Sequence, residues 1–400
     1  MFSISVSQIA RSVYLLRLED RETSYFEGLW RMPEGITYNA YLVTGPEGVV
    51  VVDGWKRGCG ELLVNTIRDI VDPRDVRFVI ANHLEPDHSG SLPELVGEAK
   101  NAVVLAHPIA GWMLESFYGL GSRFRSVADG STLELCGLRF RFIHTPWLHW
   151  PDTMVSYLED EKILFTCDIY GSYGVPSAVF YEDLPEEERA LFERYSRKYF
   201  ANVIGGYRDW VSKNLAKLES VAREAGTVAT GHGPLYRDPG IPLSLYKSLA
   251  SEKPAKGKAL VVYGSMYGFS EDTARLVVEG LKRRGLTVVL AGFTDRRRDD
   301  ESEIVSEAYD SEYLVFVSPT YETEVFPLLR YIVELLSRKT PASSKKTLAV
   351  SVYGWAGAGR KLGELLAGSG FRVVEVVEIK GSPVGYVDKL EKALDKLVES

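Results

Sequence analysis

The hydrophobic and polar positions follow different patterns in the two halves of the chain. In the first half, short runs of β-branched and aromatic residues predict strands over residues 12–18, 39–44, 48–53, 77–82 and 162–167. Two longer stretches, 186–201 and 210–225, carry apolar residues at helical spacing. A short strand over 227–230 then leads into a Gly-His-Gly turn. Most of these strands run into acidic or glycine-bearing loops, where side chains with useful chemistry collect.

Strands and helices alternate regularly in the second half. Strands are predicted over 259–263, 287–291, 313–317, 347–353 and 372–377, with amphipathic helices between them, for instance over 272–284 and 326–338. This alternation is typical of an open parallel sheet. The polar, proline-bearing segment 251–254 separates the two patterns. Because 400 residues exceed what one hydrophobic core usually holds, we expect two domains, residues 1–252 and 253–400.

Charge and composition narrow the class of protein. The net charge of −8 argues against nucleic acid or an anionic membrane as the main partner. No run of about 18 apolar residues occurs, and the first residues lack a secretory signal pattern. The three cysteines, Cys59, Cys136 and Cys167, form no C-x-x-C pair, which excludes a disulfide framework, a four-cysteine zinc site and a rubredoxin-type iron site. We expect a reduced, cytoplasmic setting.

The closest grouping of potential metal ligands in the sequence follows the predicted strand 77–82. Four potential ligands occupy positions 83, 85, 87 and 88 of a chain that has only six histidines. Two more histidines and one aspartate lie in similar places after strands. The candidate ligands are His83, Glu85, Asp87, His88, His149, Asp168 and His232. Any one of them could be a residue that caps a loop, but the joint set indicates a metal centre.

This set resembles the metallo-β-lactamase fold, a four-layered αββα sandwich that gathers its ligands from loops at one edge. Zinc members of that group carry H-x-H-x-D-H, whereas this chain has H-x-E-x-D-H, with Glu85 in place of the second histidine. A carboxylate hardens the site and favours iron or manganese over tetrahedral zinc. Together with the positions of His149, Asp168 and His232, the chain resembles the flavodiiron proteins, or A-type flavoproteins.

The resemblance implies a di-iron centre. One iron would take His83, Glu85 and His149, the other would take Asp87 and His232, and Asp168 would bridge them. His88 matches a position that is either a ligand or lies just off the metal. Tyr199 matches a donor next to the ligands, with a core aromatic as the alternative. The remaining histidines, His107 and His144, are expected to be loop or core residues.

Three loops after strands of the second half indicate a flavin site. A strand, the loop from Gly264 and a helix N-terminus form an anion site, because free backbone N–H groups point outward there. Tyr321 and Trp355, in the two other loops, are placed to cover a flat ring, with plain turns and core aromatics as the alternative. The candidate cofactor-binding residues are Ser265, Met266, Tyr267, Gly268, Phe269, Ser270, Pro319, Thr320, Tyr321, Glu322, Tyr353, Gly354, Trp355, Ala356 and Gly357.

This half resembles flavodoxin, which binds FMN. The first loop departs from the usual flavodoxin pattern of three hydroxyls, since Tyr267 replaces the middle one. Contact with the phosphate would then come from the backbone or from Ser265 and Ser270. The two resemblances cover nearly the whole chain in the family's order.

The fusion of the two halves indicates the reaction. A di-iron site that reduces a gas needs an electron carrier, whereas a hydrolase does not. The family is associated with reducing dioxygen to water and nitric oxide to nitrous oxide. Without further modules after the flavodoxin-like half, the chain resembles the minimal two-domain class, so electrons would come from a separate donor such as rubredoxin or a reduced deazaflavin. The resemblance also implies a head-to-tail homodimer or a dimer of dimers.

Two other functions stay open at this point. One is a metal-dependent hydrolase with an accessory flavodoxin domain, which Glu85 disfavours. The other is a non-catalytic flavin-binding electron carrier, which would require the seven candidate ligands to be a coincidence.

Overall fold

The computed structural model describes residues 2–251 and 254–400, which form two compact units. One unit holds the chain up to Ser251 apart from Leu29–Arg31, which group with the second unit. The boundary expected between residues 252 and 253 lies outside the described residues. Across the part of the chain that is described, no helix has the length and apolarity needed to cross a membrane. All three cysteines are buried free thiols.

The N-terminal unit contains two sheets. The larger sheet has the strand order β1 (Ser3–Gln8), β2 (Val13–Asp20), β5 (Ile36–Gly45), β6 (Gly48–Val52), β7 (Val76–Ala81), β8 (Val103–Ala106) and β9 (Phe124–Ser126). The smaller sheet has the order β10 (Thr132–Leu135), β11 (Leu138–His144), β12 (Met154–Leu158), β13 (Ile163–Cys167) and β14 (Thr227–Thr230). Short strands β3 (Tyr25–Phe26) and β4 (Trp30–Arg31) follow β2 in the chain.

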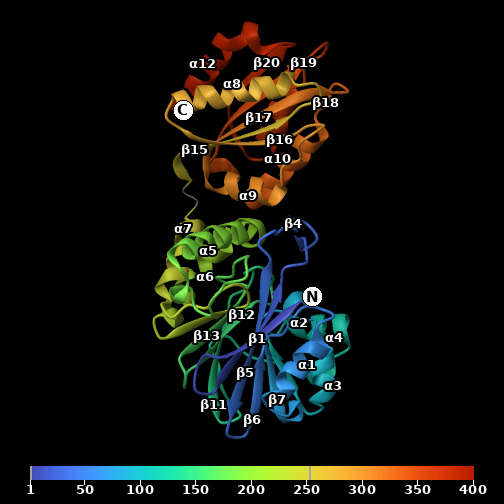
Figure 1. Cartoon of the computed structure of the whole chain (residues 1–400), viewed down its shortest axis with the longest axis vertical. Coiled ribbons are helices and arrows are strands. Elements are labelled where there is room, and N and C mark those ends of the chain that lie inside the picture. The colour runs from blue at the N-terminus through green and yellow to red at the C-terminus, as the bar shows by residue number, and fades with distance from the viewer. Residues whose placement is uncertain (1, 252–253) are drawn as a thin grey trace. The chain divides into compact units, whose positions relative to one another are not determined.

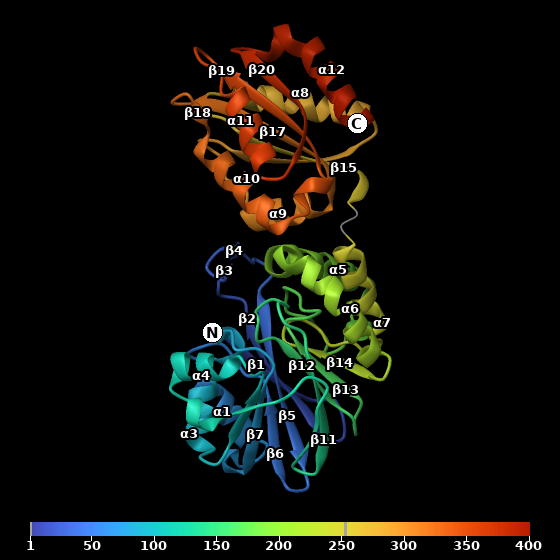
Figure 2. The ribbon, with the colours of Figure 1, turned by 180° about the vertical axis from the view of Figure 1, so that it is seen from behind.

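These two sheets pack face to face. Residues of both sheets form one hydrophobic core, in which Tyr41 of β5 meets Phe165 of β13 with ring centroids 5.0 Å apart. Helices α1 (Gly60–Arg68), α3 (Leu92–Glu98) and α4 (Ala110–Tyr118) lie together beside the larger sheet, and α6 (Arg208–Ala222) and α7 (Gly240–Ala250) lie near the smaller one (Figures 1 and 2). The expected αββα sandwich is therefore confirmed.

The C-terminal unit has a parallel sheet with helices on both faces. Its strand order is β16 (Thr287–Phe293), β15 (Ala255–Gly264), β17 (Ser311–Tyr321), β19 (Lys346–Tyr353) and β20 (Arg372–Lys380). Helices α8 (Phe269–Arg283) and α12 (Val387–Glu399) share one core with the sheet, and α9 (Glu301–Asp310), α10 (Pro327–Lys339) and α11 (Gly359–Gly368) cover the other face (Figures 1 and 2). The strand order reverses next to β15, and the ends of such strands form a ligand crevice.

The structure refines two of the expected elements. The strand expected over 313–317 continues to Tyr321 and forms a hairpin with β18 (Glu324–Val325). Its two turn residues, Glu322 and Thr323, have φ of 49° and 66°, as a tight hairpin turn requires. The helix expected over 186–201 is α5 (Glu186–Tyr199), after which Phe200–Ile204 widen into a π-helix. Such local widening often marks a functional site.

Candidate metal centre and flavin pocket

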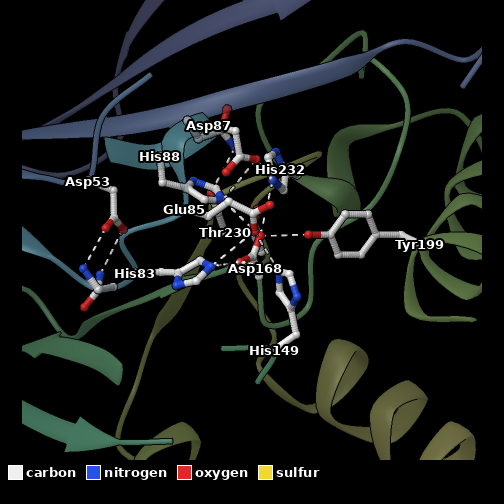
Figure 3. A network of polar contacts seen from close by, with 12 residues as sticks. Asp53, His83, Glu85, Asp87, His88, His149, Asp168, Tyr199, Thr230 and His232 are labelled. Atoms are coloured by element: carbon white, nitrogen blue, oxygen red, sulfur yellow. Dashed lines mark hydrogen bonds and ion pairs between the residues drawn. The ribbon is translucent and has the colours of Figure 1, made fainter. Parts of the chain in front are cut away.

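The candidate ligands come from four loops of the N-terminal unit. The chain leaves β7 and coils through α2 (Pro86–Ser89), whose first position is a proline suited to a helix start. His149 lies in the loop between β11 and β12, while Asp168 directly follows β13 and His232 lies two residues beyond β14. Figure 3 shows all seven side chains pointing toward one another.

One group of ligand atoms gathers around Glu85. Its Oε2 lies 2.9 Å from His149 Nε2 and 3.3 Å from His83 Nε2. Asp168 Oδ2 completes the group, at 3.5 Å from His83 Nε2 and 3.6 Å from His149 Nε2. These four residues can hold one ion.

A second group gathers around the other oxygen of Asp168. Asp168 Oδ1 lies 2.9 Å from His88 Nε2 and 3.3 Å from His232 Nε2. Asp87 Oδ2 is 3.3 Å from His232 Nε2 and 3.6 Å from His88 Nε2. The two carboxylate oxygens of Asp168 thus face two different ligand groups, which is the placement that a bridging carboxylate needs.

The donor set fits a pair of metal ions. Atoms bound about 2.1 Å from one ion lie about 3.0 Å apart at an octahedral edge and about 3.4 Å apart at a tetrahedral edge. The separations above fall close to that range. Both Oδ atoms of Asp87, Oδ2 of Asp168 and Nε2 of His149 and of His232 are buried without a well-aligned hydrogen bond within the described residues. Such atoms are expensive to bury unless an ion or water satisfies them.

Hydrogen bonds on the far side of two imidazoles fix which nitrogen faces the centre. His232 Nδ1 lies 2.7 Å from the Thr37 carbonyl, so Nδ1 carries the proton and Nε2 offers its lone pair. Asp152 Oδ1 lies 3.2 Å from His83 Nδ1, and its Oδ2 accepts from the Leu84 N–H at 2.8 Å. Asp152 therefore holds both the ring and the backbone at the start of the ligand loop.

Strands β2 and β5 hold the loop that carries His232. Asn39 Nδ2 donates to the carbonyls of Thr230 and Gly233, and the Tyr41 hydroxyl donates to Thr230 at 2.6 Å. The buried guanidinium of Arg17 donates to Asn39 Oδ1 at 3.1 Å and to the Gly233 carbonyl at 3.1 Å. Burial lowers the pKa of Arg17 to about 10. The loop is thus held by hydrogen bonds that do not involve the His232 ring.

The charges within the site depend on one another. Burial would raise the pKa of Glu85, but the close contacts with His149 and His83 outweigh it and lower this pKa to about 2. Burial would lower the pKa of His232, but contacts with Asp168 and Asp87 raise it to about 10. The carboxylates and imidazoles of the site are thus coupled in close pairs, and metal ions would replace any protons shared between them.

Tyr199 contacts the proposed bridge. Its hydroxyl donates to Asp168 Oδ1 at 2.7 Å (Figure 3). Burial, together with the charges of Asp168 and Asp87, raises the pKa of this phenol well above its usual value, so the phenol keeps its proton. His107 and His144 lie elsewhere and pack on each other, with ring centroids 4.2 Å apart.

Sequence patterns missed the residues that hold the ligands. Asp152, Arg17, Thr37 and Asn39 act through a hydrogen bond to a ring or to a carbonyl, and no spacing rule reveals such a role. Asp152 had the clearest signal, because it is an acidic residue three positions after His149 in the same loop.

A second site lies at the strand ends of the C-terminal unit. It is a cavity of about 280 Å³. Its lining residues are Ser265, Met266, Tyr267, Phe269, Ser270, Pro319, Thr320, Val352, Tyr353, Gly354, Trp355 and Gly381. Gly268, Tyr321, Glu322, Ala356 and Gly357 do not line it, and Val352 and Gly381 were not expected. Gly381 follows the fifth strand, and its N–H donates to the Tyr353 carbonyl at 2.8 Å.

This cavity fits a flat ring with a phosphate. Tyr267 and Trp355 stand 86% and 78% exposed at its rim, which is costly for aromatic side chains that cover nothing. The N-terminus of α8 supplies free N–H groups for an anion. Gly268, with φ of 94°, gives the turn a conformation that other residues rarely adopt, and its N–H donates to Ser265 Oγ at 3.0 Å.

Both halves of the chain match known protein families. Residues 36–219 match the model of the ODP family beta lactamase, and residues 261–397 match the flavodoxin model. A coenzyme F420H₂ oxidase of Methanocaldococcus jannaschii is 31% identical over 93% of this chain and 91% of its own length. A nitric oxide reductase of Moorella thermoacetica is 28% identical over 88% of this chain and 87% of its own length.

A solved structure matches the whole chain. A flavo di-iron protein of Thermotoga maritima is 38% identical, with a TM-score of 0.93 over 100% of this chain and 99% of its own. The chain therefore belongs to the flavodiiron proteins, the A-type flavoproteins that join a metallo-β-lactamase-like domain to a flavodoxin-like domain.

Proposed function

We propose that this flavodiiron oxidoreductase reduces dioxygen to water, nitric oxide to nitrous oxide, or both. The observation that carries the proposal is the placement of the two Asp168 oxygens between two separate groups of ligands. Its relatives include proteins named as an oxidase and as a nitric oxide reductase.

Each ligand has a proposed place. His83, Glu85 and His149 would hold one iron, Asp87, His88 and His232 would hold the other, and Asp168 would bridge the pair. FMN would occupy the cavity at the strand ends of the C-terminal unit. When bound, the pair of ferrous ions can supply two electrons and the reduced flavin two more. Together they match the four electrons that dioxygen reduction needs.

Residues of the chain would control the approach of the gas to the metal pair and the position of a proton beside it. Glu85 and Asp87 face a cavity of about 260 Å³, which is also lined by Phe26 and Tyr38. It is large enough for a diatomic gas to approach these two side chains. The Tyr199 phenol, which keeps its proton, holds a hydrogen bond at Asp168 Oδ1 and can stabilise charge on that oxygen.

The proposal extends to partners and setting. Electrons would come from rubredoxin or from a reduced deazaflavin, and the Methanocaldococcus relative is itself named as an oxidase of coenzyme F420H₂. The protein would work in the cytoplasm as a head-to-tail homodimer or a dimer of dimers, with the domain boundary between residues 252 and 253.

Subunit mixing would test the dimer: a metal-site variant and a flavin-site variant, each inactive alone, should regain activity in heterodimers.

Metal and flavin analysis tests the function most directly. We expect two irons and one FMN per purified chain, and consumption of dioxygen or nitric oxide by the reduced protein without release of hydrogen peroxide. Two zinc ions and no gas consumption would favour a hydrolase with an accessory flavodoxin domain. FMN without metal would indicate an electron carrier.

A further inference from the structure

Aromatic rings connect the metal centre with the surface of the N-terminal unit. The ring of Tyr207 lies 6.2 Å from the ring of His149, centroid to centroid. The ring of Trp147 stacks on that of Tyr207, with centroids 6.2 Å apart and an angle of only 18° between the ring planes. Trp210 lies 6.1 Å from Trp147. The rings of His149, Tyr207 and Trp147 thus form a continuous series.

The backbone turns Trp147 outward and His149 inward. Trp147 has φ of 66°, a strained value for a bulky residue, and its N–H donates to the Trp150 carbonyl at 2.7 Å. Its indole is 37% exposed, whereas His149 is buried. Strain of this kind persists where the surrounding structure enforces it, and it is concentrated at functional sites.

Another aromatic cluster beside the metal centre differs in this respect. Tyr199 packs against Tyr173 and Phe26, with ring centroids 5.3 Å and 6.0 Å away, and all three side chains are buried. Unlike this cluster, the series that contains Trp147 joins a proposed iron ligand to solvent.

Charges around the exposed series favour Tyr207 and Trp147 as its redox-active members. Lys213 Nζ lies 4.4 Å from the centroid of the Trp210 ring, and a cation so close opposes loss of an electron from that indole. Tyr207 is half-buried, and its ring neighbours those of His149 and Trp147.

We propose that Tyr207 and Trp147 form a one-electron relay that supplies electrons to the metal centre when the flavin is oxidised. The relay rests on the proposed function. Dioxygen needs four electrons and four protons to give two waters. Two ferrous ions would supply two electrons, the Tyr207 phenol one electron and one proton, and the Trp147 indole one electron and its N–H proton, with two protons from solvent. Two molecules of a thiol reductant would restore both residues as they form a disulfide and release two electrons and two protons.

The test uses iron- and FMN-loaded protein that has been given only two electrons per chain. One dioxygen per chain is added, samples are freeze-quenched for electron paramagnetic resonance, and peptide masses are measured afterwards. We expect an aromatic radical signal and added oxygen on Trp147, while Trp112, which is 63% exposed on α4, stays unmodified. Tyr207→Phe should abolish the oxidation of Trp147, and Trp147→Phe should leave a tyrosyl signal. Trp112→Phe should change neither.

Different outcomes separate the relay from the function. Iron content, FMN content and circular dichroism equal to wild type show that each variant is folded and loaded. If dioxygen is consumed but Trp147 is oxidised no more than Trp112, the relay is wrong and the function stands. The same holds if Tyr207→Phe leaves the oxidation of Trp147 unchanged. Protein that binds no iron or consumes no dioxygen would overturn both.

Discussion

The metal centre and the flavin pocket are built in different ways. The seven proposed metal ligands are buried or half-buried, and hydrogen bonds with Asp152, Thr37 and Arg17 fix the loops and rings that carry them. In the flavin pocket, by contrast, Tyr267 and Trp355 stand largely in solvent. A metal ion needs lone pairs with fixed directions, so neighbouring groups must hold the ligands. A flat ring mainly needs surface to cover, and the ligand itself can complete the packing.

The largest effect is expected at the proposed bridge. Asp168→Ala removes an oxygen from each ligand group and should abolish stable binding of both metal ions, while FMN content stays at the wild-type level. Metal analysis and the flavin absorbance of the same sample measure the two sites separately. Asp160→Ala, in an exposed turn of the same unit, is the control and should keep both cofactors. Wild-type iron in Asp168→Ala would show that the bridge is wrongly assigned.

A smaller loss is expected when a ligand stays but its support is weakened. Asp152→Asn keeps the shape of the side chain but removes the charge that holds His83 Nδ1 at 3.2 Å. Changes of this kind typically cost about 10- to 100-fold in metal affinity. Titration of metal-free protein with ferrous iron under anaerobic conditions measures it, with the exposed Asp209→Asn as the matched control. Equal affinities for the two variants would mean that His83 does not depend on Asp152.

The sequence pointed to the proposed ligands more clearly than to the residues that support them, for a physical reason. The proposed ligands are rare residue types placed just after strands, so a chain with six histidines shows them clearly. The support of His232 is the carbonyl of Thr37, which every residue has, and its direction depends on the register of β5. Arg17 lies on a strand where a single basic residue is usually solvated. Only the packed sheets reveal that it is buried against the Gly233 carbonyl.

The flavin half shows the same limit. Strand–helix alternation predicted the parallel sheet, and the expected sheet is confirmed. The loop residues that line the cavity could be predicted because strand ends share one edge. Gly381 could not, because its loop has no motif and its position depends on how β20 ends beside β19. The π-helix Phe200–Ile204 likewise has side chains that would suit an α-helix.

An intermediate effect is expected at the flavin pocket. Trp355→Ala removes a largely exposed ring from the rim and should weaken FMN binding by about 1–3 kcal/mol, because an aromatic face buries much apolar area when a ring stacks on it. Fluorescence titration of the flavin-free protein measures the affinity. Trp112→Ala removes a similarly exposed ring from α4 and should change nothing. If both variants bind FMN like wild type, Trp355 does not contact the flavin.

The smallest effect concerns the two histidines outside the metal centre. The histidines of the centre have neighbouring carboxylates, and the pKa of His232 rises to about 10.

For His107, burial lowers the pKa and His144 lowers it further, while Asp152 and Asp129 oppose both effects. Burial lowers the pKa of His144, and the charge of Lys217 lowers it further. Asp129 and the hydrogen bond with the Val127 carbonyl raise this pKa in part. Geometry agrees: the Ile109 N–H donates to His107 Nδ1 at 3.2 Å, which requires that nitrogen to lack a proton.

A lowered pKa has a definite consequence for stability. The unfolded chain takes up a proton near the ordinary pKa of 6.5, while folded His107 resists protonation. The stability that its neutral ring contributes is therefore present above pH 6.5 and is lost as the pH falls toward the folded pKa. Because the ring is half-exposed, the change in the free energy of unfolding is only about a few tenths of a kcal/mol. Urea unfolding of wild type and His107→Gln at about pH 7.5 and about pH 5.5 should show the advantage of wild type shrinking at the lower pH. An advantage that grows instead would mean that His107 is charged in the folded protein.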